Sequence, residues 1–227
     1  MSCMPAATKY NDLVTIRVSR ELAAHCRKTP ERAAWLVQLP DIVKALEHRW
    51  RLTAVSPLDS EAPSCSYVSA VVTQNGTPAV LKIGMPHMEG KHEVAGLRFW
   101  NGDPTVSLLE SDEKLGAMVL ERCRPGTTLR AIAEREQDVV MAGLLHRLWR
   151  LPSAPHSFRP LAVLMEYWND ETLAQAQHWF DAGLTREGLR LFKELPRDAA
   201  REVLLATDLH AGNVLRAERE PWLVHRS

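Results

Sequence analysis

Hydrophobic positions in the first fifty residues recur at helical spacing, and two sets of helix-start signals lie among them. Ser19 is suited to cap a helix over residues 21–26, and Thr29 precedes Pro30 at a first helical position. The pattern is reset at Pro40-Asp41 and then continues to Trp50. We predict helices here and interpret them as packing scaffold, because no candidate chemistry accompanies them.

From Leu52 the apolar positions alternate as they do in strands. This alternation predicts strands over residues 52–55, 67–72 and 78–83, with Asn75-Gly76 as a hairpin turn between the last two. A helix is expected over residues 89–100, because Asn101-Gly102-Asp103-Pro104 is a cluster of helix breakers. Two further strands are expected, at residues 105–109 and from Gly116 onward, with a Ser-Asp-Glu-Lys turn between them. The pattern therefore predicts a five-stranded antiparallel sheet with one inserted helix.

Helical spacing returns over residues 130–201, interrupted by three prolines. One apolar face of this region comprises Val139, Leu144, Leu145, Leu148 and Trp149, and His146 on it is interpreted as a packing residue. Three aromatic residues are expected in the core: Trp168, Trp179 and Phe180. An apolar strand, a polar loop and a second apolar strand are then predicted within residues 204–215.

Composition and charge restrict the class of protein. With 227 residues, 45% hydrophobic and 25% charged, the chain can bury a substantial core. Its 28 basic residues balance 28 acidic ones, so no overall field favours nucleic acid or an anionic membrane as a partner. Four separated cysteines without a C-x-x-C pair argue against a zinc site or a disulfide framework. No apolar run has the length of a membrane span, and we expect a cytoplasmic protein.

The polar loop within residues 204–215 holds the first candidate chemistry. Asp208 is followed five residues later by Asn213, the spacing of a kinase catalytic loop. In such a loop the carboxylate accepts the proton of an attacking hydroxyl, and the carboxamide binds a magnesium ion at the nucleotide phosphates. The structural alternative is that Asp208 is a turn residue and that Gly212-Asn213 only bend the chain.

A second candidate lies in the third predicted strand. The segment Ala79-Val80-Leu81-Lys82-Ile83 resembles the V-A-I-K strand of kinases, whose lysine reaches the nucleotide phosphates. Glu93, in the helix that follows, resembles the glutamate that pairs with this lysine. The alternatives are an exposed strand face for Lys82 and a solvated helix face for Glu93. His87 and His92 lie five residues apart, but nothing nearby supports a metal site.

The segment Asp-Leu-His-Ala-Gly-Asn-Val-Leu, at residues 208–215, resembles the catalytic loop of the aminoglycoside and hydroxyurea kinase family. Residues 119–129 closely match the family's segment L-L-E-R-x-x-P-G-x-x-L, with valine at its first position. The resemblance implies an α+β, protein-kinase-like fold of two lobes, with an N-lobe over residues 1–123 and an incomplete helical C-lobe over residues 124–227.

The same resemblance implies a role for each candidate residue. Lys82 and Glu93 would position the phosphates of ATP, and backbone groups of Glu121 and Cys123 would bond the adenine edge. Side-chain identity at those two hinge positions is then expected to be weakly constrained. Asn213 would hold magnesium, and Asp208 would orient and deprotonate the acceptor hydroxyl.

The chain departs from the family pattern at three places. Residues 63–66 read Pro-Ser-Cys-Ser rather than a glycine-rich phosphate loop, and Ala206 stands where many such kinases have histidine. After Pro-Trp-Leu-Val the family continues with Ile-Asp-Pro-Lys, whereas this chain has His225-Arg226-Ser227. We therefore expect a C-terminally truncated domain with little activity, in which Arg226 occupies the position of a metal-binding carboxylate.

These inferences predict an ATP- and magnesium-dependent phosphotransferase that acts on an alcohol group of a small molecule, such as the aminoglycoside streptomycin. Acidic residues among the later helices, Glu166, Asp170 and Glu171, would attract a cationic acceptor. One alternative is a non-catalytic nucleotide-binding fragment. Another is a helical interaction protein with an incidental D-x-x-x-x-N. The sequence defines no oligomeric state.

Overall fold

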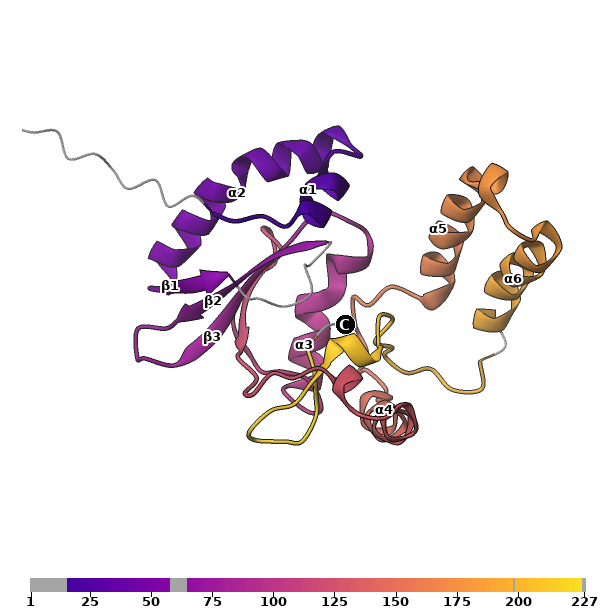
Figure 1. Cartoon of the computed structure of the whole chain (residues 1–227). Coiled ribbons are helices and arrows are strands. Elements are labelled where there is room, and N and C mark those ends of the chain that lie inside the picture. Colours follow the sequence, from indigo (N-terminus) through magenta and orange to yellow (C-terminus); the bar gives the residue numbers. More distant parts are fainter. Residues whose placement is uncertain (1–15, 58–64, 198, 226–227) are drawn as a thin grey trace, which may run out of the picture.

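The computed structural model describes residues 16–57, 65–197 and 199–225, and it contains a five-stranded antiparallel sheet with helices on both faces (Figure 1). The strand order is β1-β2-β3-β5-β4. The strands are β1 (Thr53–Pro57), β2 (Ser66–Val72), β3 (Pro78–Gly84), β4 (Leu108–Asp112) and β5 (Ala117–Glu121). All five predicted strands are confirmed, with ends shifted by a few residues.

The turn between β2 and β3 forms as the Asn75-Gly76 pair predicts. Gly76 has a φ of +83°, a conformation in which a side chain would be strained. The Thr73 amide donates to the Thr77 carbonyl at 3.0 Å and closes the turn.

The predicted strand over residues 105–109 begins later, because its first residues pair elsewhere. Thr105 forms an isolated parallel bridge with Val224, and the Val106 amide donates to the Val224 carbonyl at 2.9 Å. β4 therefore starts at Leu108 and extends through Asp112 into the predicted turn. A segment near the end of the chain is thereby fixed to the sheet.

The two N-terminal helices, α1 (Arg20–Cys26) and α2 (Pro30–Arg49), cover one face of the sheet. Both predicted caps are present: Ser19 Oγ accepts from the Leu22 amide at 3.0 Å, and Thr29 Oγ1 accepts from the Arg32 amide at 3.3 Å. The expected reset at Pro40 is wrong, since α2 runs through this residue. Its buried face continues across the proline as Trp35, Leu39, Val43 and Leu46, and burial of these side chains outweighs the lost backbone hydrogen bond.

The opposite face of the sheet is covered by α3 (Glu93–Trp100), which follows a short 3₁₀ helix, η1 (Glu89–His92). The helix expected over residues 89–100 therefore starts as a tighter turn. It ends where predicted, with Asn101 and Gly102 at φ values of 47° and 80°. Alternation along β3 sends Leu81 and Ile83 to the α1–α2 side, while Val80 packs on the α3 side.

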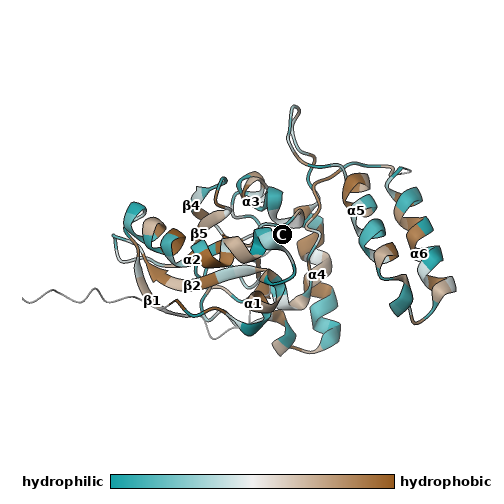
Figure 2. Cartoon of the chain, turned by 90° about the horizontal axis from the view of Figure 1, so that it is seen from above, coloured by the Kyte–Doolittle hydropathy of each residue, from teal (hydrophilic) through white to brown (hydrophobic). Residues whose placement is uncertain are grey.

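The second half of the described chain is mainly helical. Its longer helices are α4 (Glu134–Leu148), α5 (Leu161–Ala174) and α6 (Ala182–Glu194), and its single-turn helices are η2 (Leu129–Ala131), η3 (Ala176–His178), η4 (Leu195–Arg197) and η5 (Ala211–Asn213). A two-stranded sheet of β6 (Val214–Leu215) and β7 (Leu223–Val224) follows. Both views show α5 and α6 lying against each other and apart from the sheet (Figures 1 and 2).

Several predictions for the helical half need correction. Leu144 and Leu148 are buried as expected, but Val139 is exposed, and His146 is an exposed residue whose ring meets the edge of Trp149. Phe180 is fully exposed, because it lies in the link between η3 and α6, where no described element covers it. Trp168 and Trp179 are half-buried.

Polar bonds join α4 to the end of α3. The Trp100 indole Nε1 donates to the Leu148 carbonyl at 3.0 Å, and both residues are buried. Asp103 accepts hydrogen bonds from Arg147 and Arg150. Burial of the Asp103 carboxyl opposes its ionisation, but these arginine bonds outweigh burial and lower its pKa.

Within the part of the chain that the structure describes, no helix is long and apolar enough to cross a membrane.

Candidate active site

Lys82 and Glu93 form a buried ion pair between the middle of the sheet and the start of α3. Lys82 lies on β3 with Val68 and Met118 as its cross-strand neighbours. Its Nζ bonds the Glu93 Oε1, and each residue is only 8% exposed. The alternatives of an exposed strand face and a solvated helix face are therefore excluded for this pair. Each side chain stabilises the charge of the other, because burying an unpaired charge at this depth would cost several kcal/mol of folding free energy.

The segment that carries Asp208 is held against α4 by alternating apolar side chains. Leu204, Ala206, Leu209 and Ala211 pack against a core that includes Leu144 and Leu148. The apolar strand predicted at the start of residues 204–215 is wrong: the Leu204 amide donates to the Arg150 carbonyl at 2.9 Å instead of to a partner strand. The polar residues between these apolar contacts, Asp208 and His210, are left exposed.

Asn213 fixes Asp208 by hydrogen bonds from a buried position. Asn213 is 2% exposed, and its Nδ2 donates to the Asp208 carbonyl at 2.7 Å and to the Asp208 Oδ2 at 2.8 Å. The Asp208 side chain is 61% exposed. A carboxamide has two N–H donors and one oxygen. Both donors fix the aspartate, and the Asn213 Oδ1 has no hydrogen-bond partner among the described residues. The D-x-x-x-x-N spacing thus produces a clamped, accessible carboxylate rather than a simple bend.

Two histidines that the sequence did not single out complete this loop. The His210 Nδ1 accepts from the Gly212 amide at 3.0 Å, and its Nε2 lies 3.8 Å from the Asp208 Oδ1. The His225 amide donates to the Asn213 carbonyl at 3.1 Å. A sequence signal for His210 was present, since it lies two residues after the aspartate within the predicted loop. No sequence signal pointed to His225, because its contact with Asn213 depends on the pairing of β6 with β7.

Glu121 and Cys123, the predicted hinge positions, lie at the end of β5. The Glu121 amide already donates to the Ser107 carbonyl at 2.9 Å, so this N–H is not available to a ligand. Within the described residues, the Cys123 amide has no backbone acceptor. The Cys123 side chain is buried, and burial together with the nearby Glu121 carboxylate raises the pKa of its thiol to about 12.

The Glu121 side chain is more constrained than the sequence indicated. Its carboxylate accepts from the Ser107 amide at 2.9 Å and from Arg219, 98 positions later, at 2.8–3.0 Å. Burial opposes ionisation of this carboxyl, but the bonds from Arg219 and Ser107 outweigh it and lower the pKa of Glu121. The expectation of a weakly constrained side chain is therefore wrong here.

This lowered pKa predicts a pH dependence of stability. The ionised Glu121 stabilises the fold above its unfolded pKa of about 4.3, and that contribution is lost as the pH falls through the lower folded pKa. Glu121→Gln should therefore lower the melting temperature at pH 6, and the gap between variant and wild type should narrow toward pH 3. Thermal melts across this range test it. A gap that stays constant would contradict an ionic role for Glu121.

The residues of the loop fit a hard cation such as magnesium. The Asn213 Oδ1 supplies an oxygen ligand, the type that magnesium prefers. Over residues 16–57, 65–197 and 199–225, no three His, Cys, Asp or Glu side chains gather to hold a metal by themselves. Further ligands would have to come from the phosphates of a nucleotide, as is usual for magnesium. Arg226, expected at a metal-ligand position, lies outside the described residues.

The two spaced histidines, His87 and His92, make separate contacts. The His87 Nδ1 accepts from the Gly90 amide at 3.2 Å, and His92 lies edge-on to Phe158. Burial, with help from the charges of Arg159 and Lys91, lowers the pKa of His92.

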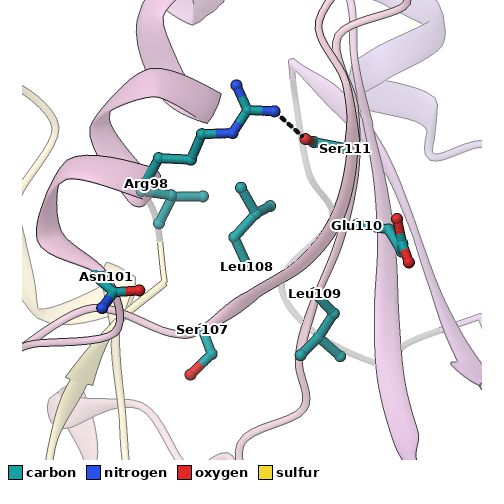
Figure 3. A pocket seen from close by; sticks show the side chains of 8 residues that line it. Arg98, Asn101, Ser107, Leu108, Leu109, Glu110 and Ser111 are labelled. Atoms are coloured by element: carbon teal, nitrogen blue, oxygen red, sulfur yellow. Dashed lines mark hydrogen bonds between the residues drawn. The ribbon is translucent and has the colours of Figure 1, made fainter.

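A hollow of about 420 Å³ lies between α3 and β4 (Figure 3). Arg98 reaches across it and donates to the Ser111 hydroxyl at 2.8 Å. None of the predicted site residues lines this hollow, although Ser107, which does, bonds Glu121.

Comparison with known proteins identifies the family of the chain. The sequence profile of the family described as aminoglycoside/hydroxyurea antibiotic resistance kinase matches residues 49–225, the region that contains both the Lys82–Glu93 pair and the Asp208–Asn213 pair. The chain belongs to this family. Among curated relatives, it is 37% identical to streptomycin 6-kinase of Streptomyces glaucescens over 197 residues, which cover 85% of this chain and 63% of that protein. It is 36% identical to hydroxyurea phosphotransferase of Kitasatospora aureofaciens over 191 residues, covering 82% and 55%.

This member of the aminoglycoside/hydroxyurea kinase family thus spans less than two thirds of the length of these curated relatives. Among solved structures, it resembles choline kinase LicA from Streptococcus pneumoniae, with a TM-score of 0.56 and 14% identity over 83% of this chain and 68% of that one. A choline/ethanolamine kinase family protein from Mesorhizobium loti gives a TM-score of 0.50 at 18% identity, over 76% and 56%. The predicted α+β, protein-kinase-like fold is therefore confirmed.

Proposed function

We propose that this chain carries the catalytic loop of an ATP-dependent phosphotransferase whose acceptor is a hydroxyl group of a small molecule. The observation that supports this best is the clamped Asp208: a buried Asn213 fixes the aspartate, yet leaves its carboxylate exposed to a substrate. A turn residue would need neither feature.

Asp208 is the base in this proposal. Its exposed carboxylate accepts the proton of the acceptor hydroxyl while that oxygen attacks the γ-phosphorus of ATP. The bond from the γ-phosphorus to the bridging oxygen breaks, and ADP leaves with the electron pair. Since Asn213 holds Asp208 at two points, little further ordering of the carboxylate is needed for reaction.

Magnesium, when bound, would neutralise charge on the phosphates, and the Asn213 Oδ1 would hold it. Lys82 would bind the α- and β-phosphates, with Glu93 keeping its ammonium group in place. The Cys123 amide, which has no backbone acceptor among the described residues, is suited to donate to the adenine ring. These roles divide the chain at Cys123 into an N-lobe over residues 1–123 and a helical lobe over residues 124–227.

The acceptor is proposed to be a cationic or strongly hydrogen-bonding small molecule. The curated relatives are named for streptomycin and hydroxyurea. Glu166, Asp170 and Glu171 are exposed on α5, where they could attract a cationic aminoglycoside. Glu171 also lines a hollow of about 390 Å³ with Trp168 and Trp179. We propose that the enzyme acts in the cytoplasm, because the wide spacing of its four cysteines fits a reducing compartment.

Release of ADP tests this function. The purified chain is incubated with ATP and magnesium, with streptomycin, hydroxyurea or neither, and ADP is measured by a coupled assay. The last three residues of the sequence predict little activity, whereas the names of the relatives favour a phosphotransferase over the non-catalytic nucleotide-binding alternative. We therefore expect measurable acceptor-dependent release of ADP. Absence of ADP release with any acceptor, from a protein that binds ATP, would instead favour that alternative.

Lys82→Ala should weaken ATP binding by about 1–3 kcal/mol, the range for a charge-assisted hydrogen bond. Lys91→Ala is a suitable control, because Lys91 is an exposed lysine only nine positions away. Isothermal calorimetry at a temperature where both variants are folded gives the comparison. Equal affinities for the two variants would remove Lys82 from the nucleotide site.

A further inference from the structure

Arg219 makes a dense set of bonds to residues far from it in sequence. Its Nε donates to the Glu121 Oε1 at 2.8 Å and Oε2 at 3.0 Å, and its Nη2 donates to the Glu121 Oε2 at 2.9 Å. The same Nη2 donates to the Thr105 carbonyl at 2.8 Å. The bonds to Glu121 raise the pKa of Arg219 and outweigh the opposing effect of its burial. The contact is a bidentate, charge-assisted pair of the kind that fixes geometry as well as adding stability.

Arg219 lies in the turn between β6 and β7, and the other end of this hairpin carries the catalytic loop. Val214 pairs with Val224, and Leu215 pairs with Leu223. Asn213 immediately precedes β6, and its carbonyl accepts from the His225 amide at 3.1 Å just beyond β7. The turn that carries Arg219 and the loop that carries Asn213 are therefore the two ends of one hairpin.

The hairpin is also attached along its length. The Arg216 amide donates to the Thr127 carbonyl at 2.8 Å, and the Gly126 amide donates to the Arg216 carbonyl at 3.1 Å. The Val224 amide donates to the Pro104 carbonyl at 3.0 Å. Hydrogen bonds thus join the segment after the hinge, at Gly126 and Thr127, to the hairpin that follows Asn213.

We propose that Arg219 is a positioning residue for the nucleotide: through Glu121 it sets the hinge at residues 121–123, and through the hairpin it sets this hinge relative to Asn213. The inference rests on the proposed function, because it assigns the adenine ring to the hinge and the phosphates to Asn213. A lysine could replace this arginine only in part, since its ammonium cannot bond both Glu121 oxygens and the Thr105 carbonyl in one plane.

The same turn offers a matched control. Glu220, the next residue, accepts from Arg147 at 2.9 and 3.0 Å, and Arg147 also bonds Asp103. Arg147→Gln therefore removes an arginine that holds the same turn to α4, but it leaves the Arg219–Glu121 contact in place. A merely structural role for Arg219 predicts that the two arginine variants behave alike.

The test compares ATP with inorganic tripolyphosphate, which has the phosphates but no adenine. Binding of each is measured by calorimetry for the wild-type protein and for Arg219→Gln, Arg219→Lys and Arg147→Gln. We expect Arg219→Gln to weaken ATP binding about tenfold, the equivalent of one charge-assisted hydrogen bond, with tripolyphosphate binding unchanged. Arg219→Lys should lie between, and Arg147→Gln should weaken neither ligand.

The remaining outcomes either contradict the inference or call for a second variant. If Arg219→Gln weakens both ligands equally, or neither, Arg219 does not act through the hinge. If it fails to fold, Glu121→Gln replaces it and must give the same selective loss of ATP binding. If the wild-type protein binds neither ligand, the proposed function fails and the inference fails with it. If it binds both and only the selective loss is missing, the inference alone is overturned.

Discussion

Replacing Asp208 by asparagine should reduce the rate of phosphoryl transfer by a factor of about 10²–10⁴, the usual contribution of a general base. The change removes the charge that accepts the hydroxyl proton, but it keeps an oxygen that can accept the bond from Asn213. We therefore expect the melting temperature and the affinity for ATP to change little. Initial rates of acceptor-dependent ADP release measure the effect.

Asp138→Asn is the control for this substitution, because Asp138 is an exposed aspartate on α4 with no role in the site. It should transfer phosphate at the wild-type rate. If both aspartate variants keep full activity, Asp208 is not the base, and its clamped geometry has another purpose.

Breaking the buried ion pair should have the largest effect on stability. Glu93→Leu leaves the Lys82 ammonium without its partner at a site only 8% exposed, and removing one member of such a pair typically costs about 3–5 kcal/mol of unfolding free energy. Urea denaturation of the variant and the wild type gives this difference.

The double variant Lys82→Met/Glu93→Leu distinguishes the effect of the unpaired charge from the effect of altered packing. With both charges removed and similar volumes kept, stability should return to near the wild-type value, as apolar replacements of buried pairs often do. ATP binding should remain weak, because the lysine is absent. A double variant as unstable as Glu93→Leu would show that packing, not the unpaired charge, causes the loss.

The local features that the sequence predicted were those with a short-range physical cause. The caps at Ser19 and Thr29 and the turn at Gly76 depend on residues three or four positions away, and each is present. The burial of Lys82 with Glu93 required only a strand, a short connection and a helix of the expected lengths. Family resemblance supplied the roles of these residues, which periodicity could not.

The features that the sequence missed depend on contacts between distant segments. Nothing near Pro40 indicates that burial of Leu39 and Val43 keeps α2 continuous through a proline. Leu204 was expected in a strand because apolar runs look alike whether their partner is a strand or a helix. Glu121 meets Arg219 across 98 positions, and no pattern in a single sequence announces such a pair.

Transfer of labelled phosphate from [γ-³²P]ATP to streptomycin or hydroxyurea tests the central claim most directly. The wild-type chain and Asp208→Asn are incubated with magnesium and each acceptor, and the acceptor is separated and counted. We predict label on an acceptor with the wild-type chain and about a hundredfold less, or lower, with Asp208→Asn. Equal labelling by the two proteins, or no labelling by a wild-type protein that binds ATP, would contradict the assignment of Asp208 as the base of a phosphotransferase.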